Sequence, residues 1–170
     1  MKKIGSKAGY VATMGVLLAL CAALTAIESA VSAFLPVGMR IGLANIVIMT
    51  AAVCVGLPSA FALTALKAAF VLLTRGITAG GMSLCGGVLA FAVTALLLSK
   101  TKAGYTVIGL ISALAHSAGQ IALAAVMTGS VYTLYYAPLL MLVSAAAGIA
   151  TGTVSGVIIP KAIKILVNNE

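Results

Sequence analysis

The sequence predicts an all-α membrane protein with six transmembrane helices, a single integral membrane domain over residues 1–170 and both termini in the cytoplasm. The chain is 63% hydrophobic, whereas an average soluble domain is about 45–50% apolar. Its apolar residues form long runs, as a bilayer-crossing helix requires. Charged groups are costly inside a bilayer, and only six lie between Tyr10 and Pro160: Glu28, Arg40, Lys67, Arg75, Lys100 and Lys102.

A helix that crosses the hydrocarbon core needs about 20 apolar residues, with a range of ~17–25. Six segments meet or approach this length, and glycine, proline or lysine separates them. They cover residues 10–34, 40–56, 58–74, 83–99, 105–128 and 137–159. We expect Gly80 and Gly81 to lie in a loop before the fourth span, and Pro160 to end the sixth. The second and fourth spans are short, so neighbouring helices are expected to cover part of them.

The N-terminus also has features of a secretory signal peptide. Lysines precede an apolar run, and Val31-Ser32-Ala33 has the small-residue pattern of a cleavage site. The run from Tyr10 to Ala33 is much longer than the ~7–15 apolar residues of a signal peptide. We therefore predict a retained first span. Cleavage is the alternative, and it would leave five spans.

Lysine positions predict the orientation. With the N-terminus in the cytoplasm, seven lysines fall on the inner side, whereas only Arg40 and Arg75 fall on outer loops and Lys67 lies within the third span. This bias agrees with the positive-inside rule. The inner lysines are Lys2, Lys3, Lys7, Lys100, Lys102, Lys161 and Lys164. The two outer arginines depart from the bias, which makes them candidates for ligand contact.

Small residues recur at helical spacing in the first and the last span. Such ridges allow two helices to approach closely in lipid. The candidate partner-docking residues of the first span are Ala12, Gly15, Ala19, Ala22 and Ala26. Ala8 precedes them at the same spacing. Docking on another membrane protein and packing within the chain both remain open for this ridge. The ridge of the last span is predicted to be an internal crossing, and it consists of Ser144, Gly148, Gly152 and Gly156.

Polar residues in the apolar spans predict a ligand site. Ser112, His116 and Gln120 are spaced to share one helical face. The candidate ligand-binding residues are Arg40, Asn45, Lys67, Arg75, His116, Gln120 and Glu28. The predicted topology puts His116 and Lys67 near mid-membrane and the others in its outer half. Three cations and one anion leave a positive surplus, which suits an anionic ligand such as a phosphate or carboxylate.

Each of these residues also has a purely structural interpretation. Glu28 could pair with Arg40 or Arg75, and Lys67 could extend its ammonium toward water. Asn45 and Gln120 could join helices at ~0.6 kcal/mol each. A single His116 is most often a hydrogen-bonded interior residue. The combined pattern favours a ligand site, because a charge at mid-bilayer costs at least ~2.5–3.5 kcal/mol.

The same sequence argues against an independent enzyme. Glu28 and Glu170 are its only acidic residues, so the paired aspartates that hold magnesium on a diphosphate do not occur. Nucleotide-binding and hydrolase motifs are absent too. Cys21, Cys54 and Cys85 lie in apolar runs without metal-ligand spacing. We predict no catalytic residue, metal or cofactor, and no nucleic-acid partner, because the net charge of +8 serves membrane orientation.

Three motifs carry a family resemblance: Arg40-Ile-Gly-Leu-Ala-Asn45-Ile, Leu84-Cys-Gly-Gly87 and Ala115-His116-Ser-Ala-Gly119-Gln120. With them the chain resembles, over nearly its whole length, a bacterial membrane family labelled heptaprenyl diphosphate synthase component I, also called the Gx transporter family. Ser117 stands where such relatives often have Asn. The family is similar to the substrate-binding S components of energy-coupling factor transporters. That similarity implies a six-helix bundle, an outward-opening pocket and an alanine-rich first helix that docks on a transmembrane partner.

Two functions are therefore expected. The first is the substrate-binding subunit of an uptake transporter in the bacterial cell membrane, for a small molecule that is vitamin-like or anionic and isoprenoid-like. Separate ATPases and a transmembrane coupling subunit would supply the energy. The alternative is a non-catalytic membrane accessory in heptaprenyl (polyprenyl) diphosphate synthesis. A channel or ion-coupled carrier is a third and weaker candidate function, since no inverted repeat is evident in the sequence and acidic residues are scarce.

Overall fold

The computed structural model of the chain describes residues 7–32, 42–130 and 135–168. Within them the chain forms helices and no strand. The helices are α1 (Lys7–Ser32), α2 (Leu43–Cys54), α3 (Leu57–Arg75), α4 (Ile77–Lys100), α5 (Tyr105–Thr128) and α6 (Ala137–Asn168). All except α2 are long and apolar enough to cross a membrane. The chain is a multi-pass membrane protein, as its composition predicts.

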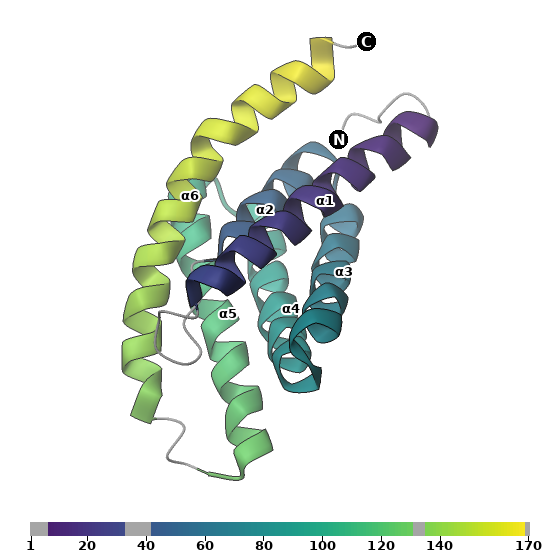
Figure 1. The fold of residues 1–170 in the computed structure, drawn as a ribbon. Helices are drawn as coiled ribbons and strands as arrows, with labels where there is room; N and C mark the ends of the chain where they lie inside the picture. The colour runs from purple at the N-terminus through teal and green to yellow at the C-terminus, as the bar shows by residue number, and fades with distance from the viewer. Residues whose placement is uncertain (1–6, 33–41, 131–134, 169–170) are drawn as a thin grey trace.

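The helices form one bundle with α1 on its outside (Figure 1). From α3 to α6, each helix packs against the next in sequence, and α2 contacts α1, α3 and α6. Helix α1 crosses the bundle obliquely and packs on α2 and α3. The first turn of α1 and the last turns of α6 lie toward the same end of the molecule in Figure 1. The count of six crossings and the cytoplasmic termini stay predictions.

Helix α2 is shorter than the predicted second span. Its 12 residues give a length of about 18 Å at 1.5 Å per residue, whereas the hydrocarbon core is about 30 Å thick. It cannot cross a membrane alone. Its start follows Gly42, whose φ of 76° favours glycine, and Gly56 with φ of 134° separates it from α3. More than half of its residues are buried, so its neighbours cover it, as expected for a short central helix.

The loop predicted at Gly80 and Gly81 is wrong. A single residue, Gly76 with φ of 86°, separates α3 from α4, and the glycine pair lies within α4. A Cβ atom at Gly80 would lie 2.7 Å from the Cα of Leu72. Gly80 therefore permits close packing of α3 against α4 just beyond their turn. The pair marks a helix contact, which in sequence looks the same as a turn.

The prediction that Pro160 ends the last helix is also wrong. Helix α6 continues through Pro160 to Asn168 and curves along its length (Figure 1). Proline loses one backbone hydrogen bond and crowds the carbonyl four residues earlier. Here that earlier residue is Gly156, which adds no side chain to the crowded turn. Membrane helices tolerate proline where the surroundings compensate for the lost bond.

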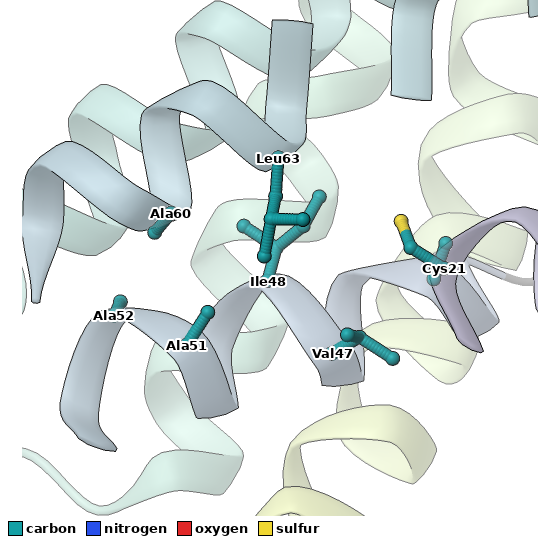
Figure 2. Packing of buried hydrophobic residues seen from close by; sticks show 8 residues of the cluster. Cys21, Val47, Ile48, Ala51, Ala52, Ala60 and Leu63 are labelled. Carbon is teal, nitrogen blue, oxygen red and sulfur yellow. The ribbon is translucent and has the colours of Figure 1, made fainter. Parts of the chain in front are cut away.

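Two apolar clusters hold the bundle together. In the first, side chains of α1, α2 and α3 meet (Figure 2), and the labelled residues are Cys21, Val47, Ile48, Ala51, Ala52, Ala60 and Leu63. The second joins α2, α5 and α6 through the buried residues Met49, Ile108 and Ile159. Leu97 and Leu98, near the end of α4, pack against this second cluster. It therefore fills the interior near the connection between α4 and α5.

Glycines mark a close crossing of α5 and α6. A Cβ atom at Gly109 of α5 would lie 2.6 Å from the carbonyl oxygen of Gly148 and 2.6 Å from the Cα of Gly152. One at Gly148 would lie 2.7 Å from the Cβ of Ala113. The ridge of α6 thus packs directly on α5. The predicted internal crossing is confirmed at Gly148 and Gly152.

Candidate functional site

A small polar cavity lies inside the bundle. Its volume is about 20 Å³. It is lined by Glu28, Gly42, Asn45, Lys67, Ala113, His116, Ser117, Gln120, Ser144, Ala147 and Thr151. These residues come from α1, α3, α5, α6 and the start of α2. Five of the seven predicted ligand-binding residues therefore meet here, although they are spread over almost 100 positions of sequence: Glu28, Asn45, Lys67, His116 and Gln120.

A second cavity of about 30 Å³ adjoins the first, and Asn45, Lys67 and Thr151 line both. Hydroxyls of Thr64, Thr94, Ser112 and Ser155 continue its polar lining, together with apolar side chains such as Ile48 and Phe91. A water molecule needs roughly 10–15 Å³ on this scale. The two spaces are therefore water-sized, and an organic ligand would need the helices to move apart.

Two charged side chains are buried among the described residues, Glu28 at 4% exposure and Lys67 at 6%. Both bond to the start of α2. The backbone N–H of Gly42 donates to Oε1 of Glu28 at 2.7 Å, and Nζ of Lys67 donates to Oδ1 of Asn45 at 3.2 Å. The N–H of Asn45 donates in turn to the Gly42 carbonyl at 2.9 Å. One helical turn thus joins the buried carboxylate to the buried ammonium.

Hydroxyl pairs connect the helices in the walls of the two cavities. The Ser117 and Ser144 hydroxyls form a hydrogen bond between α5 and α6, and Thr94 bonds Ser112 at 2.6 Å between α4 and α5. Ser117, which departs from the family pattern, lines the cavity. Its hydroxyl also bonds Ser144, the first residue of the small-residue ridge of α6. Sequence reasoning missed Ser144 and Thr151 as lining residues. Ser144 and Thr151 are seven residues apart, on the helix face that carries Gly148, and this spacing could have identified them.

One of the two predicted outer arginines, Arg75, does not line this cavity. It is exposed at the end of α3, and its Nη1 donates to Oγ of Ser29 on α1 at 3.3 Å. The other, Arg40, lies outside the described residues. Among the described residues, the cavity contains one carboxylate and one ammonium.

The small-residue ridge of α1 faces away from the rest of the chain. Ala8, Ala12, Gly15, Ala19 and Ala26 are exposed, and Ala22 is half-buried. The buried residues of α1 are Cys21, Thr25 and Glu28, on another side of the helix. Among the described residues, no atom lies within 4 Å of where a Cβ atom would be at Gly15, apart from its own helix. The described part of the chain therefore does not pack on the ridge at Gly15, and partner docking stays a prediction.

The cavity can bind a polar ligand through ionic and neutral hydrogen bonds. It offers a carboxylate, an ammonium, an imidazole, two amides and several hydroxyls. Among the described residues, no group of three or more His, Cys, Asp or Glu side chains is placed to hold a metal ion.

Comparison with known families gives one match. A family described as heptaprenyl diphosphate synthase component I matches residues 17–158. The match includes every residue that lines the two cavities. No curated protein and no solved structure matches the chain.

Proposed function

The chain belongs to the heptaprenyl diphosphate synthase component I family, and we propose that it is the substrate-binding membrane subunit of a small-molecule uptake transporter. The observation that carries this proposal is the cavity at the start of α2. Polar residues that lipid would penalise converge there from separate helices. Such residues in membrane proteins commonly mark a substrate site. The proposed location is the bacterial cell membrane.

The residues around the cavity take distinct roles in this proposal. Lys67 receives an anionic group of the ligand, such as a carboxylate or phosphate, because a charge-assisted hydrogen bond is about twice as strong as a neutral one. Asn45, His116 and Gln120 orient the ligand through hydrogen bonds. Arg40 and Arg75 attract the anionic group of the ligand, and Arg75 does so from an exposed position at the end of α3.

The apolar cluster of Met49, Ile108 and Ile159 supports capture of a ligand over passage through an open channel. These three residues are at most 5% exposed and fill the interior near the α4–α5 connection. A channel needs a polar or water-filled path across the whole membrane. Capture needs access from one side only, and a separate energised module would then drive release on the other side.

The exposed ridge of α1 is the proposed docking surface for that module. A transmembrane coupling subunit would pack on Ala12, Gly15, Ala19, Ala22 and Ala26, because small residues allow the backbones of two helices to approach closely. ATPases would bind the coupling subunit from the cytoplasm. The chain itself is proposed to be non-catalytic.

Affinity purification in mild detergent tests this proposal. We expect ATPase subunits and a transmembrane coupling subunit to co-purify with the parent chain. They should be lost from the double variant Ala19→Leu/Ala22→Leu, in which two bulky side chains stand on the ridge. Purification of the parent with neither type of subunit, under conditions that keep other membrane complexes intact, would contradict the transporter proposal.

The family description favours a second candidate, a non-catalytic membrane accessory in heptaprenyl (polyprenyl) diphosphate synthesis. In that case a soluble prenyltransferase should co-purify with the chain. Its product length or rate should change when the chain is added in lipid vesicles. A prenyltransferase that neither binds the chain nor responds to it would reject this candidate.

A further inference from the structure

The motifs that contain Gly86 and Gly119 form a tight crossing of α4 and α5. A Cβ atom at Gly119 would lie 2.9 Å from the Cys85 carbonyl oxygen, and one at Gly86 would lie 2.6 Å from the His116 carbonyl oxygen. The two backbones touch here because both positions lack a side chain. The crossing therefore supports the turn of α5 that reaches the cavity.

The side chain of Gln120 extends from this crossing into the cavity. Its Cγ lies 3.0 Å from where a Cβ atom would be at Gly86, so its stem rests on the α4 backbone. Gln120 is 4% exposed and lines the cavity, and no described residue forms a hydrogen bond with its carboxamide. Buried polar groups in proteins are nearly always hydrogen-bonded. This amide is buried and held in place, and its hydrogen-bonding groups are available to a ligand.

The chemistry of an amide restricts what can pair with it. A primary amide presents an N–H donor and a carbonyl acceptor side by side. A ligand that displaces water from the cavity has to satisfy both, because a buried polar group left unpaired is costly. A carboxylate offers acceptors only, and an ammonium offers donors only. An alcohol has both functions on a single oxygen. A second amide-type edge, with N–H beside C=O, matches both groups at once.

Two further lining residues have hydrogen-bonding groups that suit such a ligand. Oε1 of Glu28 accepts from the Gly42 N–H at 2.7 Å, and the second oxygen of this carboxylate can accept a ligand N–H. Oδ1 of Asn45 accepts from Lys67 at 3.2 Å, and the amide nitrogen of Asn45 can donate to a ligand carbonyl. Both residues line the cavity together with Gln120.

We infer that the ligand presents an uncharged amide-type edge, an N–H group beside a C=O group, to Gln120. Lactams, ureas and nitrogen heterocycles with a ring amide carry this edge. The inference rests on the proposed substrate-binding function and adds the chemical class of the part of the ligand that faces α5. The anionic group assigned to Lys67 faces α3 and belongs to another part of the ligand.

Two matched probes test the inference on the detergent-purified parent chain. The first, δ-valerolactam, is a small ring with N–H beside C=O. The second, N-methyl-δ-valerolactam, lacks the N–H and is more apolar, so non-specific uptake into detergent would favour it. Saturation-transfer NMR titrations compare their affinities. We expect the parent to bind δ-valerolactam about tenfold more tightly, because the methylated probe leaves the Gln120 carbonyl unpaired.

The variant Gln120→Met removes the amide and keeps a side chain of similar length. It should lose the preference between the two probes. The matched control Ile111→Met, at an exposed position of the same helix, should keep the preference. Without a probe, the Tm of Gln120→Met should equal or exceed that of the parent, because the amide has no hydrogen-bond partner among the described residues. A purely structural amide would instead give a lower Tm.

Several results would overturn the inference: no binding of either probe to the parent, equal binding of both, a preference that survives in Gln120→Met, or a marked fall in the Tm of that variant. The proposed function is decided separately, by co-purification of ATPase and coupling subunits. A parent chain that retains those subunits but does not distinguish the probes would disprove the inference alone. A parent that distinguishes the probes without those subunits would contradict the transporter proposal alone.

Discussion

The small-residue ridges of α1 and α6 share one sequence pattern and take opposite places in the structure. On α6, Gly148 and Gly152 pack against α5 so closely that an added Cβ atom would lie within 3 Å of α5 atoms. On α1, Gly15 has open space beside it and Ala19 is exposed. The spacing thus predicts that a helix can be approached closely. It does not predict which helix approaches it, because the pattern describes only one of the two surfaces.

The largest effect is expected at the internal crossing. Gly148→Leu would place a side chain where Cβ alone meets Ala113 at 2.7 Å and the Gly109 carbonyl at 2.8 Å. Because α5 cannot yield locally, we expect a loss of about 3 kcal/mol or more in the free energy of unfolding, the upper end for overpacking. Unfolding in mild detergent measures it. The matched control Gly15→Leu should unfold like the parent. Equal stability of both variants would contradict the contrast between the ridges.

A large effect on partner binding is expected at the small-residue ridge of α1. Ala19→Leu/Ala22→Leu should reduce co-purified partner subunits more than tenfold, because the bulky side chains hold the partner helix away. The Tm and ligand binding of the isolated chain should change little. The control Val11→Leu/Val16→Leu alters exposed apolar positions of the same helix outside the ridge. If transport and partner binding persist in the ridge variant, the ridge is not a docking surface.

A smaller effect is expected where the cavity meets α2. Asn45→Ala removes one acceptor of Lys67, so we expect stability to fall by about 1.5–3 kcal/mol, the range for a hydrogen bond to a charged group. Gln120→Ala should weaken ligand binding by about 0.5–1.5 kcal/mol, with a smaller change in stability. Unfolding and binding are measured side by side. If both variants bind like the parent and only melt lower, the cavity residues join helices and the ligand site lies elsewhere.

The smallest effect is expected at the contact between the C-terminal ends of α1 and α3. Ser29→Ala removes the acceptor of the 3.3 Å bond from Arg75, at an exposed position. Exposed interactions of charged side chains contribute about 0–1 kcal/mol, so we expect Tm to fall by no more than about 4 °C. A large loss of stability would mean that α1 is held to the bundle far more strongly than its exposed surface indicates.

Helix ends could be predicted where a glycine or proline has a single structural role. Helix α5 begins and ends as predicted, at 105 and 128, because Gly104 and Gly129 flank an uninterrupted apolar run. The start of α4 was missed because Gly80 serves helix packing, and the end of α6 was missed because membrane helices tolerate Pro160. The second span was predicted to be short, but α2 is shorter still, because it begins only after Gly42 and ends at Cys54.

The candidate site was predictable where a residue is rare in lipid. Glu28, Asn45, Lys67, His116 and Gln120 could be found because charges and amides seldom occur in apolar spans. Thr151 was missed because a hydroxyl in such a helix can bond its own backbone, as Thr151 does with the Ala147 carbonyl at 2.9 Å. Arg75 was assigned by its position at a span end, and there an arginine reaches the exterior more readily than the core.

Native mass spectrometry of the detergent-purified protein tests the central claim most directly, because it reports whether the cavity at the start of α2 holds a small molecule. The parent chain and the ridge variant Ala19→Leu/Ala22→Leu should both carry the same non-covalent adduct. Asn45→Ala and Gln120→Ala should carry it at lower occupancy in the same preparation. An adduct of equal occupancy in all four proteins, or a parent chain that never carries one, would contradict the account.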